Sequence, residues 1–146
     1  MSVQKYFTEE DKLQITNAIR VAETNTSGEI RVHIEKHCKE DVLDRAAYIF
    51  EKLKMHKTEL RNGVLFYVAI EDHKFAILGD VGINQKVPDD FWEEIKSDVF
   101  EKFKDAKYAE GLAEGIIKAG EQLKAHFPYQ DDDVNELSDE ISFGKN

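Results

Sequence analysis

The stretch GVLFYVAI at residues 63–70 is the longest uninterrupted apolar run in the chain, and it decides the fold. An apolar run of this length, with no polar residue at alternate positions, is typical of a central strand covered on both faces. Residues 71–74 are short enough for a hairpin turn. Residues 75–78 are again apolar, so they predict a strand that returns antiparallel beside the central one.

Upstream of this run, residues 29–35 alternate between apolar and polar side chains, which predicts a strand with one apolar face. A helical pattern at 42–53 separates the two strands, so they should be parallel and joined by a right-handed crossover. Helical periodicity is also present near residues 9–22, 92–103 and 108–123. The sequence therefore predicts an α/β fold, a three-layer α/β/α sandwich in which about four main helices cover a small mixed β-sheet.

The composition limits the class of protein. The 146 residues include 20 Lys and Arg against 30 Asp and Glu, which gives a net charge of −10, and 41% are hydrophobic. These values fit one folded domain and argue against non-specific nucleic-acid binding, which needs a basic face. No stretch approaches the ~20 apolar residues that span a bilayer, and residues 1–11 have no apolar core of a signal peptide. We therefore expect a cytoplasmic protein with no membrane span and no nucleic-acid partner.

Half of the net charge lies at the C-terminal end, where residues 129–146 contain six acids and one base. This segment follows Phe127 and Pro128, a pair that suits the end of a helix, and it has no periodicity. The sequence thus divides into a folded domain at 1–128 and an acidic, flexible tail at 129–146. Docking of Ile141 and Phe143 on the domain surface is the alternative.

The predicted topology gathers polar loops at one end of the sheet, because two parallel strands start there and the antiparallel strand ends there. Hard oxygen atoms from several loops suit Ca²⁺ or Mg²⁺. Nearby basic and glycine residues could hold an anion or let the backbone approach closely. The candidate metal ligands are Glu29, Asn62, Asp80 and Asp89, and the candidate supporting residues are Arg61, Gly79 and Gly82.

Simpler interpretations exist for the same residues. The sequence Gly-Asp-Val-Gly at 79–82 is a common turn, and Asp89 or Asp90 suits the N-cap of the following helix. At the opposite end of the sheet, ordinary exposed histidines are favoured over a soft-metal site. The residues concerned there are His33, His37, Cys38 and His73.

Four blocks, taken in order, resemble the TPM domain, a family of thylakoid lumen photosystem II repair proteins, a worm receptor modulator and small bacterial proteins. They are SGEIRV at 27–32, RA at 45–46, RNGVL at 61–65 and GDVGI at 79–83. The resemblance covers about residues 8–128. It implies an α/β/α sandwich, divalent-cation binding as in some members, and the acid phosphatase activity of the thylakoid branch. By position, it also implies Glu29, Asp80 and Asp89 as ligands, with Asn62 in support.

Three functions follow as hypotheses. The first is a non-enzymatic accessory or interaction module that binds Ca²⁺ or Mg²⁺ at the loop end of the sheet. The alternative is a metal-assisted acid phosphatase acting on phosphomonoesters, in which the cation activates water and Arg61 faces the phosphate. No catalytic residue can be assigned for it. The third is an adaptor whose protein partner docks on a helix face without a metal.

Overall fold

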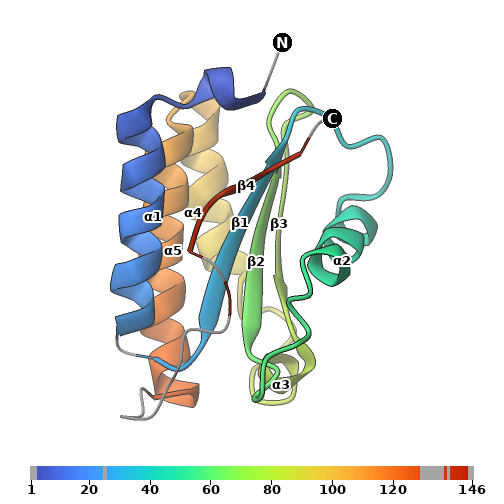
Figure 1. The fold of residues 1–146 in the computed structure, drawn as a ribbon, viewed down its shortest axis with the longest axis vertical. Coiled ribbons are helices and arrows are strands. Elements are labelled where there is room, and N and C mark those ends of the chain that lie inside the picture. The colour runs from blue at the N-terminus through green and yellow to red at the C-terminus, as the bar shows by residue number, and fades with distance from the viewer. Residues whose placement is uncertain (1–2, 25, 129–136, 138, 145–146) are drawn as a thin grey trace.

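The computed structural model describes residues 3–24, 26–128, 137 and 139–144. In chain order, its elements are a 3₁₀ helix at Val3–Tyr6, α1 (Glu9–Thr24), β1 (Glu29–Glu35), α2 (Val42–Lys52), β2 (Gly63–Ala69), β3 (Lys74–Gly79), α3 (Val81–Asn84), α4 (Glu93–Lys104), α5 (Tyr108–His126) and β4 (Ser142–Phe143). Figure 1 shows α1, α4 and α5 on one face of the sheet and α2 on the other. This arrangement confirms the predicted α/β sandwich.

In the described residues, the sheet has the strand order β3-β2-β1-β4. Strands β1 and β2 are parallel, with Glu29 opposite Gly63 and Glu35 opposite Ala69. Strand β3 runs antiparallel to β2. The predicted parallel pair and hairpin strand are therefore both present.

The central strand β2 separates two hydrophobic clusters, and all of its residues are buried. Val64, Phe66 and Val68 pack with α1, α4 and α5, whereas Leu65 and Tyr67 pack with α2. Successive side chains of a strand point to opposite faces, so an unbroken apolar run satisfies both layers at once. This is why residues 63–70 alone predicted helices on both sides.

Strand β1 has the one apolar face that the alternation predicted, but its polar face, toward α2, is buried as well. Glu29, His33 and Glu35 are 4%, 5% and 1% exposed, although they occupy the polar positions of the alternating pattern. Helix α2 and the C-terminal residues cover this face, and polar partners satisfy its side chains. Burial of charged groups requires such partners.

Two of the helices begin at side-chain caps, whereas the cap expected at Asp89 or Asp90 is absent. At the start of α1, the Thr8 hydroxyl accepts from the Asp11 amide, and the Asp11 carboxylate accepts from the Thr8 amide. At the start of α2, the Asp41 carboxylate accepts from two backbone amides of the helix. Neither Asp89 nor Asp90 caps α4, because successive turns from Pro88 delay the helix start to Glu93. Within the described ranges, none of the helices combines the length and the apolar character that crossing a bilayer requires.

The C-terminal strand β4 lies parallel to β1, with Ser142 opposite His33 and Phe143 opposite Ile34. The amide of Gly144 donates to the Ile34 carbonyl at 2.9 Å. Ile141 and Phe143 also pack against the core of the domain. Docking of these two side chains, the alternative to a flexible tail, is thus the arrangement of residues 139–144. The boundary at 128 stays a prediction, since residues 129–136 lie outside the described part.

Candidate functional site

The three polar loops do meet at one end of the sheet, beside α3 at the bottom of Figure 1. Glu29 lies opposite Gly63 in the register of β1 and β2, and the Asp80 amide donates to the Gly63 carbonyl at 3.0 Å. The neighbours Ile30, Val64 and Ile77 face α1, α4 and α5. Glu29, Gly63 and Asp80 therefore occupy the opposite face, toward α2.

Asp80 and Arg61 form a bidentate ion pair. Arg61 Nε and Nη2 each donate to one carboxylate oxygen of Asp80 at 2.8 Å, and the Val81 amide donates to Oδ1 at 2.7 Å. The Asp80 side chain is 4% exposed, whereas the Arg61 side chain is 44% exposed. The hydrogen bond to Asp80 raises the pKa of Arg61. Asp80 is also the N-cap of α3, a role that the turn interpretation of 79–82 did not include.

The backbone around Arg61 is shaped to bring its side chain to Asp80. Arg61 has a φ of 50°, in the left-handed region that few residues other than glycine adopt. Its carbonyl accepts from the Gly82 amide at 2.9 Å. A β-carbon at Gly82 would lie 2.2 Å from the Leu60 carbonyl oxygen, so this close approach requires glycine.

Glu29 also has a protein partner. Its Oε1 accepts from the Leu137 amide at 2.7 Å. A β-carbon built on Gly63 would meet the Leu137 side chain at 3.5 Å, so Leu137 lies over the strand between Glu29 and Asp80. With one strand between them, the two Cα atoms are about 10 Å apart. In this arrangement, the Leu137 amide occupies Oε1 of Glu29, and Arg61 occupies both carboxylate oxygens of Asp80.

Asn62 ties two of the loops together. Its Nδ2 donates to the Ser27 carbonyl at 2.9 Å, and its backbone carbonyl accepts from the Glu29 amide at 3.2 Å. The residue is 2% exposed. The side-chain oxygen Oδ1 is the group that could ligate an ion.

Asp89 is not brought to this cluster by any described hydrogen bond. It is exposed, in the turns between α3 and α4. Over the described part of the chain, no group of three or more His, Cys, Asp and Glu side chains is arranged to hold a metal ion. The ligand set therefore stays a prediction.

A carboxyl pair that the sequence analysis missed lies at the same end of β1. Glu23, from α1, accepts from the Ile30 amide at 2.9 Å. Burial, then a hydrogen bond to Asp139, raise the pKa of Glu23 to about 9. Glu23 is thus protonated at neutral pH and shares its proton with Asp139. More than a hundred residues separate the two, so no local pattern could reveal the pair.

Replacing Glu23 with Gln should stabilise the protein at alkaline pH. A pKa raised in the folded state gives stability that is present below the unfolded pKa and lost as the pH rises toward 9. Gln can accept from Ile30 and donate to Asp139 without titrating. As the pH rises from 5.5 to 8.5, the free energy of unfolding of E23Q should increase by about 1–2 kcal/mol relative to that of wild type. Urea unfolding at the two pH values measures this change. Equal pH dependence of the two proteins would contradict the shared proton.

A second missed cluster surrounds the buried Glu35 carboxylate on the α2 side of the sheet. Arg45 donates from Nε at 3.1 Å and from Nη2 at 2.5 Å, and the Tyr67 hydroxyl donates at 2.5 Å. His33 Nε2 lies 3.1 Å from the carboxylate, and its Nδ1 lies 2.8 Å from the Ser142 hydroxyl. The cluster thus joins α2 and β4 to the sheet.

The electrostatics of this cluster follow from those contacts. Burial alone would raise the pKa of Glu35, but the hydrogen bonds from His33, Arg45 and Tyr67 lower it to about 2. Burial and the bond to Glu35 raise the pKa of Tyr67. Glu35 is therefore ionised and Tyr67 neutral at every physiological pH. His33 contacts Glu35 and His37 contacts Asp72, and among the described residues at this end of the sheet no group of three or more side chains is arranged for a soft metal.

Comparison with known proteins places these features in a family context. A family model described as the TPM domain matches residues 2–122. The chain is 49% identical to the BA42 protein of the psychrophilic bacterium Bizionia argentinensis, whose NMR structure superposes with a TM-score of 0.91 over 97% of this chain and 98% of that one. A comparison with curated proteins finds no match.

Two more distant solved structures share the fold. The N-terminal domain of the cg2496 protein from Corynebacterium glutamicum has 12% identity and a TM-score of 0.66, over 99% of this chain and 84% of that one. The N-terminal domain of a protein from P. gingivalis has 18% identity and a TM-score of 0.68, over 86% and 81% of the two chains. At these identities, the likeness concerns the fold alone.

Proposed function

Because the chain belongs to the TPM domain family, we propose that it is an accessory module that binds Ca²⁺ or Mg²⁺ at the loop end of the sheet, around Asp80. The donors there are carboxylate and amide oxygens, the chemistry that these hard cations prefer. Asp80 and the side-chain oxygen of Asn62 would hold the ion, and Glu29 would support it from β1, with β2 between the two carboxylates. Asp89 would join only if the turns before α4 rearrange.

The observation that carries this proposal is the pairing of a buried carboxylate with an exposed, displaceable cation. The Asp80 side chain is fixed by the Val81 amide and almost fully buried, while the Arg61 side chain is 44% exposed. Because the guanidinium is half exposed, it can move into solvent once a divalent ion compensates the charge of the buried carboxylate. A divalent ion brings twice the charge to the same carboxylate. Arg61 would then act as the resident counter-ion that Ca²⁺ or Mg²⁺ replaces.

This exchange predicts that removing the competing cation strengthens metal binding. Arg61→Gln should raise the affinity for Ca²⁺ and Mg²⁺ about tenfold, because the ion no longer has to displace a guanidinium. Asp80→Asn should lower it at least about tenfold, since the ion loses its charged ligand. The measurement is a titration followed by amide NMR shifts, which should centre on residues 28–29, 61–63 and 79–82.

Lys57→Gln is the matched control, because it removes an exposed positive charge from the loop that precedes Arg61 without touching Asp80. Its affinity should stay within about twofold of wild type. The proposal fails if the ions move none of the named amides in wild type. It also fails if Arg61→Gln binds no more tightly than Lys57→Gln.

The half-exposed guanidinium of Arg61 favours the phosphatase as a second candidate, since it could pair with a phosphoryl group. The same variant separates the two functions. In a phosphatase, Arg61→Gln would lose turnover of a phosphomonoester such as p-nitrophenyl phosphate while gaining affinity for Mg²⁺. If wild-type protein loaded with Mg²⁺ gives no turnover, only the binding module is left.

A further inference from the structure

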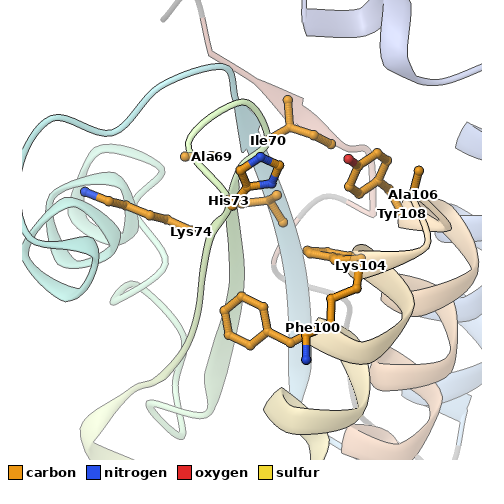
Figure 2. A pocket seen from close by; sticks show the side chains of 10 residues that line it. Ala69, Ile70, His73, Lys74, Phe100, Lys104, Ala106 and Tyr108 are labelled. Carbon is orange, nitrogen blue, oxygen red and sulfur yellow. The ribbon is translucent and has the colours of Figure 1, made fainter.

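A cavity of about 440 Å³ lies at the other end of the sheet from Asp80, between the β2–β3 hairpin and the segment that joins α4 to α5. Figure 2 shows side chains of the hairpin on one side and those of Phe100, Lys104 and Tyr108 on the other. Its volume falls within the ~300–1,000 Å³ range of small-molecule sites.

The wall of this cavity is aromatic and aliphatic. Phe103 and Tyr108 have ring centroids 5.3 Å apart, and the ring of Phe75 behind them is 5.6 Å from Phe103. Val68 and Ile70, both nearly fully buried, complete the apolar part. Phe100, Phe103 and Tyr108 are only partly buried, so an apolar ligand could cover ring surface that now faces solvent.

The polar groups at the cavity are basic, in a chain with a net charge of −10. His73, Lys74 and Lys104 line it, and none of its described lining residues is an acid. Four acids adjoin the lining residues in sequence: Glu71 and Asp72 bond Tyr6 and His37, Glu101 pairs with Lys104, and Asp105 is exposed at the end of α4. The charged side chains that line the cavity are thus basic, although acids adjoin them in sequence.

The three basic residues are not equivalent. Lys74 donates to the carbonyls of Cys38 and Glu40, and in Figure 2 its side chain runs away from the cavity. Lys104 pairs with Glu101 at 3.1 Å, but both side chains are about 70% exposed, so the pair is easily exchanged. His73 has a φ of 55°, which places it at the tip of the hairpin beside the opening. His73 and Lys104 are therefore the groups that could meet an anionic head group.

From this combination, we infer that the cavity binds a small amphiphilic monocarboxylate, an alkyl or aryl chain with one carboxylate. The chain would lie on Ile70, Phe100 and Phe103, and the carboxylate would face Lys104, His73 and the Tyr108 hydroxyl. A neutral apolar ligand would leave the basic groups unused, and an anion without an apolar body would leave the rings exposed. This site is independent of the cation site, since the whole length of β2 separates the two.

The test uses octanoate and two probes that each lack one of its properties: 1-octanol lacks the carboxylate, and acetate lacks the long alkyl chain. All three are used below the concentration at which octanoate forms micelles. Binding to the full chain is followed by amide NMR shifts. Octanoate should shift residues 68–74 and 100–108 in a saturable way and should bind about tenfold more tightly than 1-octanol, because a charge-assisted hydrogen bond is added. Acetate should shift neither segment.

Two variants locate the carboxylate. Lys104→Gln and His73→Asn should each weaken octanoate binding about two- to fivefold and leave 1-octanol unchanged, as expected for exposed charges. Asn is chosen because it tolerates the left-handed backbone of the hairpin. Lys124→Gln, which removes an exposed charge from the far end of α5, should leave both affinities unchanged. Equal binding of octanoate and 1-octanol, or shifts outside the two segments, would overturn the inference.

Discussion

Replacing Arg45 with Met is expected to lower the free energy of unfolding by about 3–5 kcal/mol, because it leaves a buried carboxylate without its charged partner. Arg45 donates twice to Glu35, whose side chain is 1% exposed. Met conserves most of the side-chain volume, so the loss reports the charge and the hydrogen bonds rather than a cavity. Urea unfolding at pH 7 measures it.

The double variant Arg45→Met/Glu35→Gln provides the first control. It removes the buried charge together with its partner, and removal of both partners costs much less than removal of one. We expect it to recover at least half of the stability that Arg45→Met loses. Arg20→Met is the second control, since Arg20 is 62% exposed and lies 4.0 Å from Asp139. It should cost less than about 1 kcal/mol.

The effect of Arg45→Met should depend on pH in a defined direction. The pKa of Glu35 is lowered to about 2 in the folded protein, against about 4.3 for an unperturbed Glu. A lowered pKa gives stability that is present above the unfolded value and lost as the pH falls through the folded value. The gap between wild type and Arg45→Met should therefore narrow between pH 4.5 and 2. A constant gap over this range would mean that the loss arises from packing alone.

The layers of the fold could be predicted from the sequence because periodicity reports burial directly. Residues 63–70 are apolar on both faces of a strand, so both faces must be covered, and the helical patterns elsewhere in the chain supply the covering layers. In β1, the alternation correctly predicted one apolar face but did not show that Glu29 and Glu35, on the polar face, are buried. A pattern of polar residues does not show whether their side chains face solvent or bond to buried polar partners.

The candidate site was predictable in its position but not in its contacts. Strand directions alone brought the loops of Glu29, Asn62 and Asp80 to one end of the sheet, as observed. Arg61 was expected to face an anion, and the observed anion is the carboxylate of Asp80 itself. The role of Leu137 could not be foreseen, because its hydrogen bond to Glu29 spans more than a hundred residues. Long-range pairs of this kind leave no trace in local periodicity.

Gly82→Ala should be among the most destabilising single-methyl additions in the chain, at about 3 kcal/mol or more. The added β-carbon would lie 2.2 Å from the Leu60 carbonyl oxygen and 2.6 Å from that of Arg61. Both contacts are with backbone, so no side-chain rotation can relieve them. The loop that carries Arg61 must move, which breaks the 2.9 Å hydrogen bond from the Gly82 amide to the Arg61 carbonyl.

Helix propensity alone predicts the opposite sign for this substitution. Gly82 lies inside α3 and, like the other described glycines, has no positive φ, so Ala should gain about 1 kcal/mol there. The steric clash is the larger effect, because overlap with two backbone oxygens exceeds what a rotamer change can absorb. Gly79→Ala is the matched control in the same segment. Its β-carbon would meet only side chains, those of Ile83 at 3.3 Å and Asn84 at 3.6 Å, and the substitution should cost no more than about 1 kcal/mol.

The two glycine variants also test whether the loop backbone positions Arg61 for Asp80. In Gly82→Ala, the displaced loop should separate the guanidinium from the carboxylate, which the NMR shift of the Arg61 Nε–H would report. In Gly79→Ala, this signal should stay at its wild-type position. If Gly82→Ala unfolds within about 0.5 kcal/mol of wild type and keeps the Arg61 signal, the close approach of α3 to this loop does not hold the ion pair in place.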